Sequence, residues 1–402
     1  MKVAYYSPMP PSRSGIADYS TLLLPALRAR IEEIVVAEPG KRAPRADIAL
    51  YHVGNNPDAH GWIVDALKAR PGIVVLHELV LHHLIAGITI GRGNGRGYLA
   101  AMERDFGVAG RLLGLGVLDN LLPLIWETQP ERFPLTGTVL DLAEGVIVHS
   151  HYVERGVREA GYGGPVWRIP HPSWPDETIE PADLHGDPLV GCFGYLNMNK
   201  RIPQLLEAFT LLQRKRPGAR LLLVGDSGER FDLDRRLERL GIGGESLIRE
   251  TWVSEQRFWE LMAACDVLVN LRSPTMGETS GSVIRGLSLG KPMLVSDLGW
   301  FAELPDGVAL RIPVDEYEVP TIAAALELAA DHAADLGAAG QEYVRRDHDL
   351  AQVADAYTAA LEEAAGGEAV ENAMLMRIAT AAAEAGLDPV DVARAAREAG
   401  LV

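Results

Sequence analysis

Two adjacent cations, Lys200 and Arg201, stand where a strand pattern gives way to a helical one. They lie in the segment CFGYLNMNKRIPQLLEAF, in which Gly194 ends an apolar run and an amphipathic pattern follows the cations. A helix N-terminus presents free N–H groups to an anion, and charge-assisted hydrogen bonds from basic side chains strengthen phosphate binding. We therefore predict that Lys200 and Arg201 contact a pyrophosphate group.

A glycine- and serine-rich loop later in the chain has a second anion-binding pattern. In VLVNLRSPTMGETSGSVIRGLSLGKPMLVSD a strand runs into the loop, and a helix starts near Ser280. The N–H groups of Gly281 and Ser282 would face outward at that helix start, where backbone amides can cradle phosphate oxygens. Glu278, at the mouth of the loop, can accept hydrogen bonds from sugar hydroxyls, although an acid in such a loop is also typical of a cap.

The first half of the chain holds weaker signals of the same kind. Gly15, in the loop SPMPPSRSGIADYS, would let the backbone approach a ligand at the start of a helix. Asn55 and Asn56, in YHVGNNPDAH, provide amide groups suited to sugar hydroxyls. Isolated turn residues of these types are more often structural than functional. They count as candidates here only because they occur together with the stronger segments.

His77 ends a predicted strand in GIVVLHELVLHH, the position where active-site residues gather in α/β domains. Without that context, a core or surface histidine would be the more ordinary interpretation. The histidines that follow it do not form the HExxH zinc pattern, so we predict no metal site. The basic stretch GRGNGRG (91–97) is either a lid over an anionic acceptor or a surface loop.

These segments are set in an alternation of strand-length apolar runs and helical patterns, which is typical of parallel α/β sheets. The segment PHPSWPDETIEPADLHGDP, with five prolines, divides the alternation in two. The predicted strands are 3–7, 33–37, 48–53, 73–77, 145–149 and 166–170 before it, and 189–193, 220–225, 246–251, 267–270, 292–296 and 308–312 after it. We therefore predict two doubly wound, Rossmann-like α/β domains, residues 1–183 and 184–365, that face a central cleft.

The last residues follow a different pattern. The alanine-rich stretch after Gly366 and Gly367 predicts two short helices, the second with Asp388 as N-cap and Pro389 as its first residue. We expect residues 366–402 to form a helical appendage that covers the body of the protein or contacts a partner.

Composition limits the partners and the location of the protein. A net charge of −17 argues against nucleic acid as a partner. Residues 1–183 hold 17 of the 38 basic side chains but 21 of the 55 acidic ones, so the first domain is the one expected to approach an anionic surface. The two cysteines lie in apolar contexts and indicate buried thiols. Because no apolar run could span a bilayer and prolines interrupt the first one, we expect a cytoplasmic protein, with peripheral contact to the inner face of the membrane as an option.

Together these segments resemble the retaining glycosyltransferases of family 4, which have a two-Rossmann, B-type glycosyltransferase fold. The likeness covers roughly residues 1–365 and rests on the order and spacing of SGIADYS, VVLHE, GYLNMNKRI, VGDSG, ETWVSEQRFWELMAACDVLVNLR and GETSGSVIRGLSLGKPMLVSDLGWFAEL. The resemblance implies that the second domain holds a nucleotide-diphosphate sugar, that the first holds an acceptor, and that neither a metal nor another cofactor is essential.

The resemblance also implies roles for four residues. Gly15 would lie near the donor phosphates, and His77 near the donor sugar and the reaction centre. Lys200 matches the lysine that neutralises the leaving diphosphate. Glu278 matches the first acid of a Glu-(seven residues)-Glu motif and would hold the donor sugar.

The chain departs from the family pattern in four ways. The second acid of the motif, which grips the ribose, is replaced by Gly286, and the segment is one residue short, so that alignment from its far end places Arg285 there instead. Tyr195 replaces an arginine that commonly follows the glycine of the phosphate strand, and Glu78 replaces an aspartate after the histidine. The missing acid bears directly on how a nucleotide is recognised.

We therefore expect a metal-independent, retaining enzyme that moves a hexose from a nucleotide-diphosphate sugar to a hydroxyl of a glycan, a lipid-linked acceptor or a small molecule. Cations and helix N-termini would stabilise the departing diphosphate. The alternatives are an epimerase or phosphorylase on the same fold and a non-catalytic subunit that binds sugar nucleotides. Release of nucleoside diphosphate without acceptor would separate an enzyme from a binder.

Overall fold

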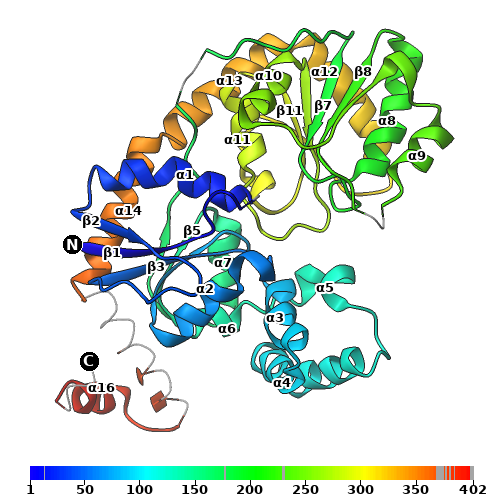
Figure 1. Cartoon of the computed structure of the whole chain (residues 1–402). Helices are drawn as coiled ribbons and strands as arrows, with labels where there is room; N and C mark the ends of the chain where they lie inside the picture. Colours follow the sequence, from blue (N-terminus) through cyan, green and yellow to red (C-terminus); the bar gives the residue numbers. More distant parts are fainter. Residues whose placement is uncertain are drawn as a thin grey trace. The chain divides into compact units, whose positions relative to one another are not determined.

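The computed structural model describes residues 1–12, 14–175, 178–228 and 231–367, and beyond these residues 375, 378–379, 382–383 and 385–398. The chain divides into two compact units (Figure 1). The first comprises 1–172, 276–279 and 350–402, and the second comprises 173–275 and 280–349. The sequence-based division at 183/184 differs from this one because it assigned 173–183 to the first domain and 276–279 and 350–365 to the second.

The first unit is built on a six-stranded parallel sheet with the order β2-β1-β3-β4-β5-β6. Its strands are β1 (Lys2–Tyr6), β2 (Glu33–Val36), β3 (Ile48–Val53), β4 (Gly72–Leu76), β5 (Ala143–Val148) and β6 (Val166–Arg168). The order of the strands reverses between β1 and β3. Ligands of open α/β sheets bind at the carboxyl ends of the strands near such a reversal.

Alternation along the strands divides the side chains of this sheet between two faces. The face that includes Tyr51 and Val74 is covered by α2 (Pro57–Ala69), α3 (His82–Thr89), α4 (Gly95–Leu118), α6 (Gly137–Leu140) and α7 (His151–Glu159). The face that includes Leu50 and Val75 is covered by α1 (Gly15–Arg28) and by α14 (Leu350–Ala365). Both faces of the sheet are therefore buried, as a parallel sheet requires.

Helix α14 belongs to the core of the first unit although it lies near the end of the chain (Figure 1). The hydroxyls of Tyr19 and Tyr357 are hydrogen-bonded at 2.7 Å, and Trp167 Nε1 donates to Glu363 at 2.9 Å. Tyr357 and Leu361 are fully buried against α1 and the sheet. These long-range contacts explain why the sequence pattern alone did not place this helix.

A helical insertion between β4 and β5, which the sequence did not predict, contains α3, α4, α5 (Ile125–Thr128) and α6. Helix α4 folds back on itself at Gly107, whose φ of 62° and ψ of −155° lie outside the helical region and favour glycine. Asn94 caps α4 by accepting a hydrogen bond from the Gly97 N–H at 2.9 Å. The stretch 91–97 is thus the turn that starts α4.

The second unit has a six-stranded parallel sheet with the order β12-β11-β10-β7-β8-β9. Its strands are β7 (Leu189–Phe193), β8 (Arg220–Val224), β9 (Leu247–Glu250), β10 (Val267–Asn270), β11 (Met293–Ser296) and β12 (Leu310–Ile312). One face is covered by α8 (Ile202–Lys215), α9 (Leu233–Leu240) and α12 (Glu318–Asp331), and the other by α10 (Glu255–Ala264), α11 (Gly281–Ser288) and α13 (Ala333–Asp347). The order reverses between the central strands β7 and β10.

The predicted fold class is confirmed, since every predicted strand is present and both sheets are doubly wound. Of the predicted C-terminal pair, α16 (Pro389–Glu398) is described, and Asp388 caps it by accepting from the Val390 N–H at 2.8 Å. The first helix of that pair falls largely outside the described residues. Within the part of the chain that the structure describes, no helix combines the length and apolarity needed to cross a membrane.

Candidate functional site

In the second unit, the side-chain amine of Lys200 is held at the carboxyl end of β7. Lys200 is 8% exposed, and its Nζ donates a hydrogen bond to the carbonyl of Phe193, the last residue of the strand. Gly194 has a φ of +92°, and a Cβ at this position would lie 2.5 Å from Lys200 Nζ. Glycine is therefore required both by the backbone conformation and by the space that the amine occupies.

A second cation, Arg272, lies at the carboxyl end of the neighbouring strand β10. The Ser273 N–H donates to the Asn199 carbonyl at 2.8 Å and so joins the loop after β10 to the loop that carries Lys200. Burial raises the pKa of the Cys192 thiol in β7, and the positive charges of Lys200 and Arg272 oppose that rise. Sequence analysis missed Arg272, although its place directly after a strand, in VLVNLRSP, is the signal that marks it.

Helix α11 begins at the same strand ends. Ser280 caps it by accepting from the Val283 N–H at 3.4 Å, and Asn270 Nδ2, at the end of β10, donates to the Ser280 hydroxyl at 3.3 Å. Gly281 and Ser282 are the first residues of the helix, so their N–H groups have no partner within the helical ladder. The structure thus places the Lys200 loop, Arg272 and the Gly281–Ser282 amides at the ends of two adjacent strands.

Arg201 does not join Lys200, Arg272 and the Gly281–Ser282 amides, because its guanidinium is held in an ion pair. Arg201 adopts a left-handed conformation, with a φ of 55°, directly before α8. Its guanidinium donates to both carboxylate oxygens of Glu318, from Nε at 2.9 Å and from Nη2. The Glu318 side chain is 3% exposed, so this ion pair compensates a buried acid and ties α8 to α12.

Glu278 is folded back onto its own loop. Its Oε2 accepts a hydrogen bond from the Met276 N–H at 2.8 Å, and the Met276 carbonyl accepts from the Val80 N–H at 3.0 Å. Burial raises the pKa of the Tyr152 hydroxyl, and the negative charge of Glu278 adds to that rise. Residues 276–279 therefore pack on the first unit, whereas Gly281 and Ser282 belong to the second.

Arg285 and Gly286, the two candidates for the position of the missing acid, both face the interior of the second unit. The Arg285 guanidinium stacks 3.9 Å from the ring centroid of Trp174 and also lies over Phe258 and Trp259, and its Nη2 donates to Glu255 at 3.1 Å. A Cβ on Gly286 would lie 2.6 Å from Met293 Sδ. Neither position offers a carboxylate, and Gly286 has no room for one. Arg285 instead fastens the proline-rich segment to α10 and α11.

The three weaker candidates lie at the switch point of the first unit. Gly15 is exposed at the start of α1, beside the cap Ser14, and nothing lies within 4 Å of a Cβ built on it. Asn55 Oδ1 accepts from the Leu84 N–H at 3.1 Å, and Asn56 Oδ1 accepts from the Asp58 N–H at 2.9 Å. The carboxamide oxygens of both asparagines therefore already stabilise backbone turns.

His77 belongs to a cluster of four buried histidines in the first unit. Strand alternation places His52, His77, His149 and His171 on the face that α1 and α14 cover, because they continue the buried positions Leu50, Val75, Ile147 and Ile169. The Tyr19 ring of α1 lies 4.8 Å from both His77 and His171, 5.4 Å from His149 and 5.8 Å from His52. Sequence analysis identified His77 alone. The shared signal was a histidine near the end of each of four successive strands.

Hydrogen bonds hold the cluster in place, and burial keeps His52 and His77 neutral. His52 Nδ1 lies 3.0 Å from His77 Nε2, and His149 Nδ1 donates to the Ile169 carbonyl at 2.8 Å. His60 Nδ1 donates to the His52 carbonyl at 3.1 Å. Burial lowers the pKa of His52 and of His77 well below 6.5, and the neighbouring imidazoles lower it further. His77 is therefore uncharged at neutral pH.

Within the described ranges, no group of three or more His, Cys, Asp and Glu side chains is arranged to hold a metal ion. That the reaction needs no metal or cofactor stays a prediction, because nothing in the structure tests it.

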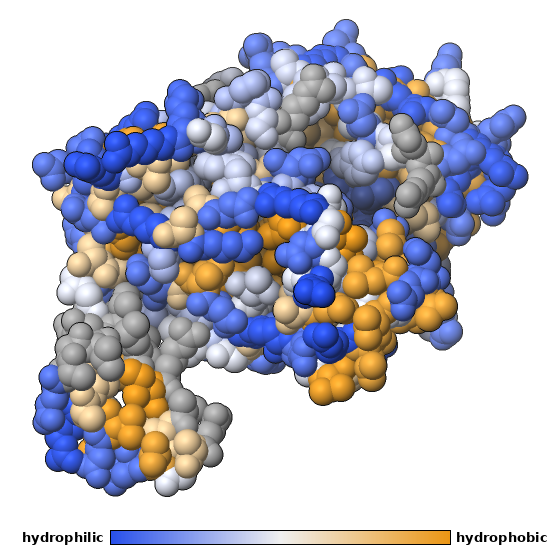
Figure 2. Space-filling view, turned by 60° about the horizontal axis from the view of Figure 1, so that its bottom comes forward, coloured by the Kyte–Doolittle hydropathy of each residue, from blue (hydrophilic) through white to orange (hydrophobic). Residues whose placement is uncertain are grey.

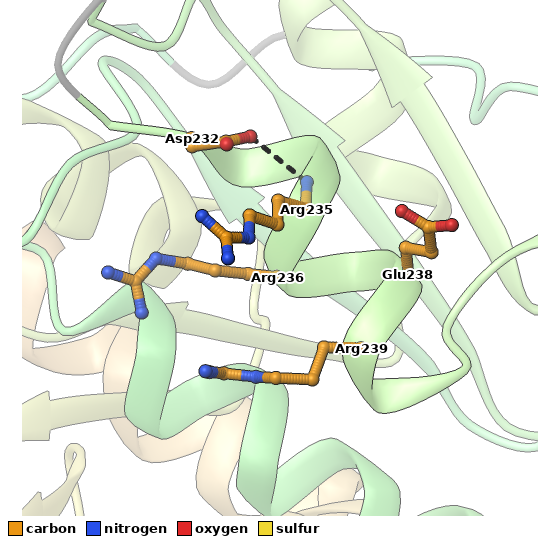
Figure 3. Close-up of a pocket in the computed structure, with 5 residues that line it drawn as sticks. All are labelled: Asp232, Arg235, Arg236, Glu238 and Arg239. Atoms are coloured by element: carbon orange, nitrogen blue, oxygen red, sulfur yellow. Dashed lines mark hydrogen bonds between the residues drawn. The ribbon is translucent and has the colours of Figure 1, made fainter.

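An open hollow of about 430 Å³ lies over α9 and is lined by Asp232, Arg235, Arg236, Glu238 and Arg239 (Figure 3). Asp232 caps the helix by accepting from the Arg235 N–H at 3.0 Å, and Arg236 Nη2 lies 3.8 Å from Met198 Sδ. The side chains come from one helix and its cap, and no strand end contributes to the lining. We assign no role in the chemistry to this hollow.

Part of the chain, most of it in the second unit, matches a family model. Residues 187–332 match the family model described as glycosyl transferases group 1, a region that contains Lys200, Arg272, Gly281 and Ser282. No match was found among curated proteins.

Solved structures share the whole fold. The chain is similar to HepE of Anabaena in complex with UDP, with a TM-score of 0.58 and 14% identity over 90% of this chain and 100% of that one. It is also similar to sucrose-phosphate synthase from Thermosynechococcus elongatus, with a TM-score of 0.62 and 16% identity over 92% and 100%. A third similar structure is AviGT4, a glycosyltransferase involved in avilamycin A biosynthesis. Its TM-score is 0.55, with 15% identity over 91% of this chain and 98% of that one.

The solved structures confirm the two-Rossmann, B-type glycosyltransferase fold. The family model supports a group 1 glycosyltransferase domain over residues 187–332. Membership of family 4, retention of configuration and the roles of the individual residues stay predictions.

The buried histidines of the first unit predict that this unit loses stability in acid. Burial lowers the pKa of His60 to about 4 from 6.5, so in the folded state it stays neutral where the unfolded chain already binds a proton. Stability should therefore fall as pH drops below about 6.5, by up to about 1.4 kcal/mol per pH unit for each such histidine. Denaturant unfolding between about pH 7.5 and pH 5 measures this slope.

A matched pair of variants tests whether histidine burial causes this pH dependence of the unfolding free energy. His60→Gln should remove one histidine's share of it, whereas His185→Gln should leave it unchanged because that imidazole is exposed. An unfolding free energy that is constant over this pH range would contradict the neutral, desolvated state of these buried histidines.

Proposed function

We propose that the protein is a retaining, family 4 glycosyltransferase that transfers a hexose from a nucleotide-diphosphate sugar to an acceptor hydroxyl without a metal. The observation that carries the proposal is the buried Lys200 amine at the switch point of the second unit, within the region that matches the group 1 glycosyltransferase model. UDP-glucose is the first donor to test, because HepE of Anabaena was solved with UDP, with UDP and glucose, and with UDP-glucose.

The cations at this edge suit the main electrostatic demand of such a transfer, which is the negative charge that develops on the departing diphosphate. Lys200 is already desolvated and fixed, so it would not need to reorganise when that charge appears. Arg272 and the α11 amides, at the ends of the same two strands, would contact further phosphate oxygens. We assign Arg201, which Glu318 neutralises, to the packing of this edge.

The first unit would supply the groups that act on the sugar and the acceptor. A neutral His77 can form a hydrogen bond with a sugar oxygen without adding a further positive charge. A non-catalytic sugar-nucleotide binder is the second candidate, because the structure offers no acid in place of the missing ribose contact. Turnover of the donor separates the two: an enzyme releases nucleoside diphosphate and a binder does not.

Lys200→Ala should weaken UDP binding about ten- to hundredfold, since a charge-assisted contact to phosphate is worth about 1.5–3 kcal/mol, and should leave uridine binding nearly unchanged. Isothermal titration calorimetry with UDP and with uridine measures both. Lys215→Ala is the charge-matched control, because Lys215 is exposed and paired with Glu327 on the helix surface. Equal UDP affinity in wild type and Lys200→Ala would remove Lys200 from the site and take away the main support of the proposal.

We propose further that the acceptor side of the first unit docks on a lipid surface. The second limb of α4 and the turn after it present a leucine face, which is visible as an orange surface in Figure 2. It consists of Val108 (68% exposed), Leu112 (62%), Leu115 (38%), Leu121 (79%), Leu122 (37%) and Leu124 (37%). Exposed apolar patches of this kind mark interaction sites.

Two features favour lipid over a protein partner. Six partly exposed aliphatic side chains offer less area than the roughly 800 Å² per partner that a stable dimer buries. Leucine and valine are also under-represented among the residues that dominate binding at protein interfaces, whereas acyl chains accept them without defined pockets.

Leu112→Asp combined with Leu121→Asp should abolish sedimentation of the protein with phosphatidylcholine–phosphatidylglycerol vesicles, because it places two charges in the docking face. Leu328→Asp is the control, since Leu328 is 48% exposed on α12 of the second unit. No vesicle binding by the wild type, or a dimer in solution that the double variant dissociates, would contradict the lipid assignment.

A further inference from the structure

The ring of His77 is hydrogen-bonded to a second imidazole. His52 Nδ1 and His77 Nε2 are 3.0 Å apart, with ring centroids 5.3 Å apart and planes inclined at 29°. The pair joins adjacent strands, since His52 lies within β3 and His77 directly follows β4. One proton lies between the two nitrogens, so one ring donates and the other accepts.

The surroundings of His52 determine which ring donates. His52 is fully buried, with the ring of Tyr5 at 4.6 Å and that of Tyr19 at 5.8 Å. Its Nε2 is buried and has no hydrogen-bond partner among the described residues. A buried N–H without an acceptor is rarer in proteins than an acceptor with an unused lone pair. This favours the form of His52 that carries its proton on Nδ1 and leaves only a lone pair at Nε2.

We propose that His52 is a positioning residue: it donates from Nδ1 to Nε2 of His77 and so holds the His77 proton on Nδ1. The proposal deepens the proposed function and rests on it for the role of His77 in transfer. Burial and the facing imidazoles of His149, His60 and His171 oppose the charged form of His77, so each ring of the pair keeps one proton.

The consequence is a defined chemical role for His77. With Nε2 occupied as an acceptor, its remaining polar atom is an Nδ1–H, which donates a hydrogen bond and cannot take up a proton. His77 keeps 9% of its surface exposed, so its ring still reaches the edge of the core. It would therefore stabilise an oxygen of the donor sugar or of the diphosphate rather than act as a general base.

The first test reads the tautomer directly and needs no activity. In protein labelled with ¹⁵N-histidine, long-range ¹H–¹⁵N spectra distinguish protonated from unprotonated ring nitrogens, and His77→Ala identifies the His77 signals. We expect a protonated Nδ1 and an unprotonated Nε2 on His77. A proton on Nε2 overturns the proposal whether or not the protein turns over UDP-glucose.

The second test uses two variants of equal size. In His52→Asn the side-chain amide nitrogen takes the place of Nδ1 and can still donate, whereas His52→Leu has the same shape without a donor. We expect His52→Leu to lower kcat for UDP-glucose turnover about tenfold with KM unchanged, and His52→Asn to restore most of it. Equal loss in both variants, with both folded by circular dichroism, overturns the positioning role.

A wild type that turns over no nucleotide sugar, but shows the expected tautomer, would count against the proposed function and not against the histidine pair. The tautomer and the turnover therefore separate the two proposals.

Discussion

The cost of burying polar groups at the carboxyl ends of parallel strands is the constraint on which this structure depends. Each unit meets it differently. In the second unit a backbone carbonyl accepts a hydrogen bond from the Lys200 amine, and a glycine turn makes room for that amine. In the first unit His52 and His77, at the strand ends, lose their charge, because burial and the neighbouring imidazoles both oppose it. The two units thus offer complementary chemistry: fixed positive charge in one and neutral hydrogen-bonding groups in the other.

Periodicity predicted the framework well. Strand-length apolar runs are a local signal, and all of the predicted strands are present because both faces of each sheet are buried. The same alternation also carries the positions of the buried histidines. It places His52, His77, His149 and His171 on one face, so the cluster around Tyr19 follows from the sequence once the histidines are counted along four strands.

What the sequence could not provide are contacts between distant segments. The pairing of Arg201 with Glu318, the packing of α14 on α1 and the stacking of Arg285 on Trp174 each join segments far apart in the chain. Arg201 and Lys200 are neighbours with similar local sequence signals. Arg201 compensates a buried acid, whereas Lys200 faces a strand end. Tertiary contacts determine which of these roles a residue has, and sequence spacing does not reveal those contacts.

The structure also gives a physical account of the missing motif acid. Arg285 is enclosed by three aromatic rings and Glu255, and Gly286 faces Met293 in the core. An acid at Gly286 would collide with the core, and one at Arg285 would leave the aromatic cage without its cation. The chain has therefore used this position to secure the proline-rich segment, and a nucleoside bound here would rely on other groups.

The central claim is a division of labour, in which the second unit holds the diphosphate and His77 of the first acts on the sugar. The most direct test compares UDP affinity by calorimetry with nucleoside diphosphate release from UDP-glucose for His77→Ala. The account predicts UDP affinity within about twofold of wild type and a loss of turnover of about a hundredfold or more. A loss of UDP affinity as large as that of turnover, or turnover that persists without His77, would contradict it.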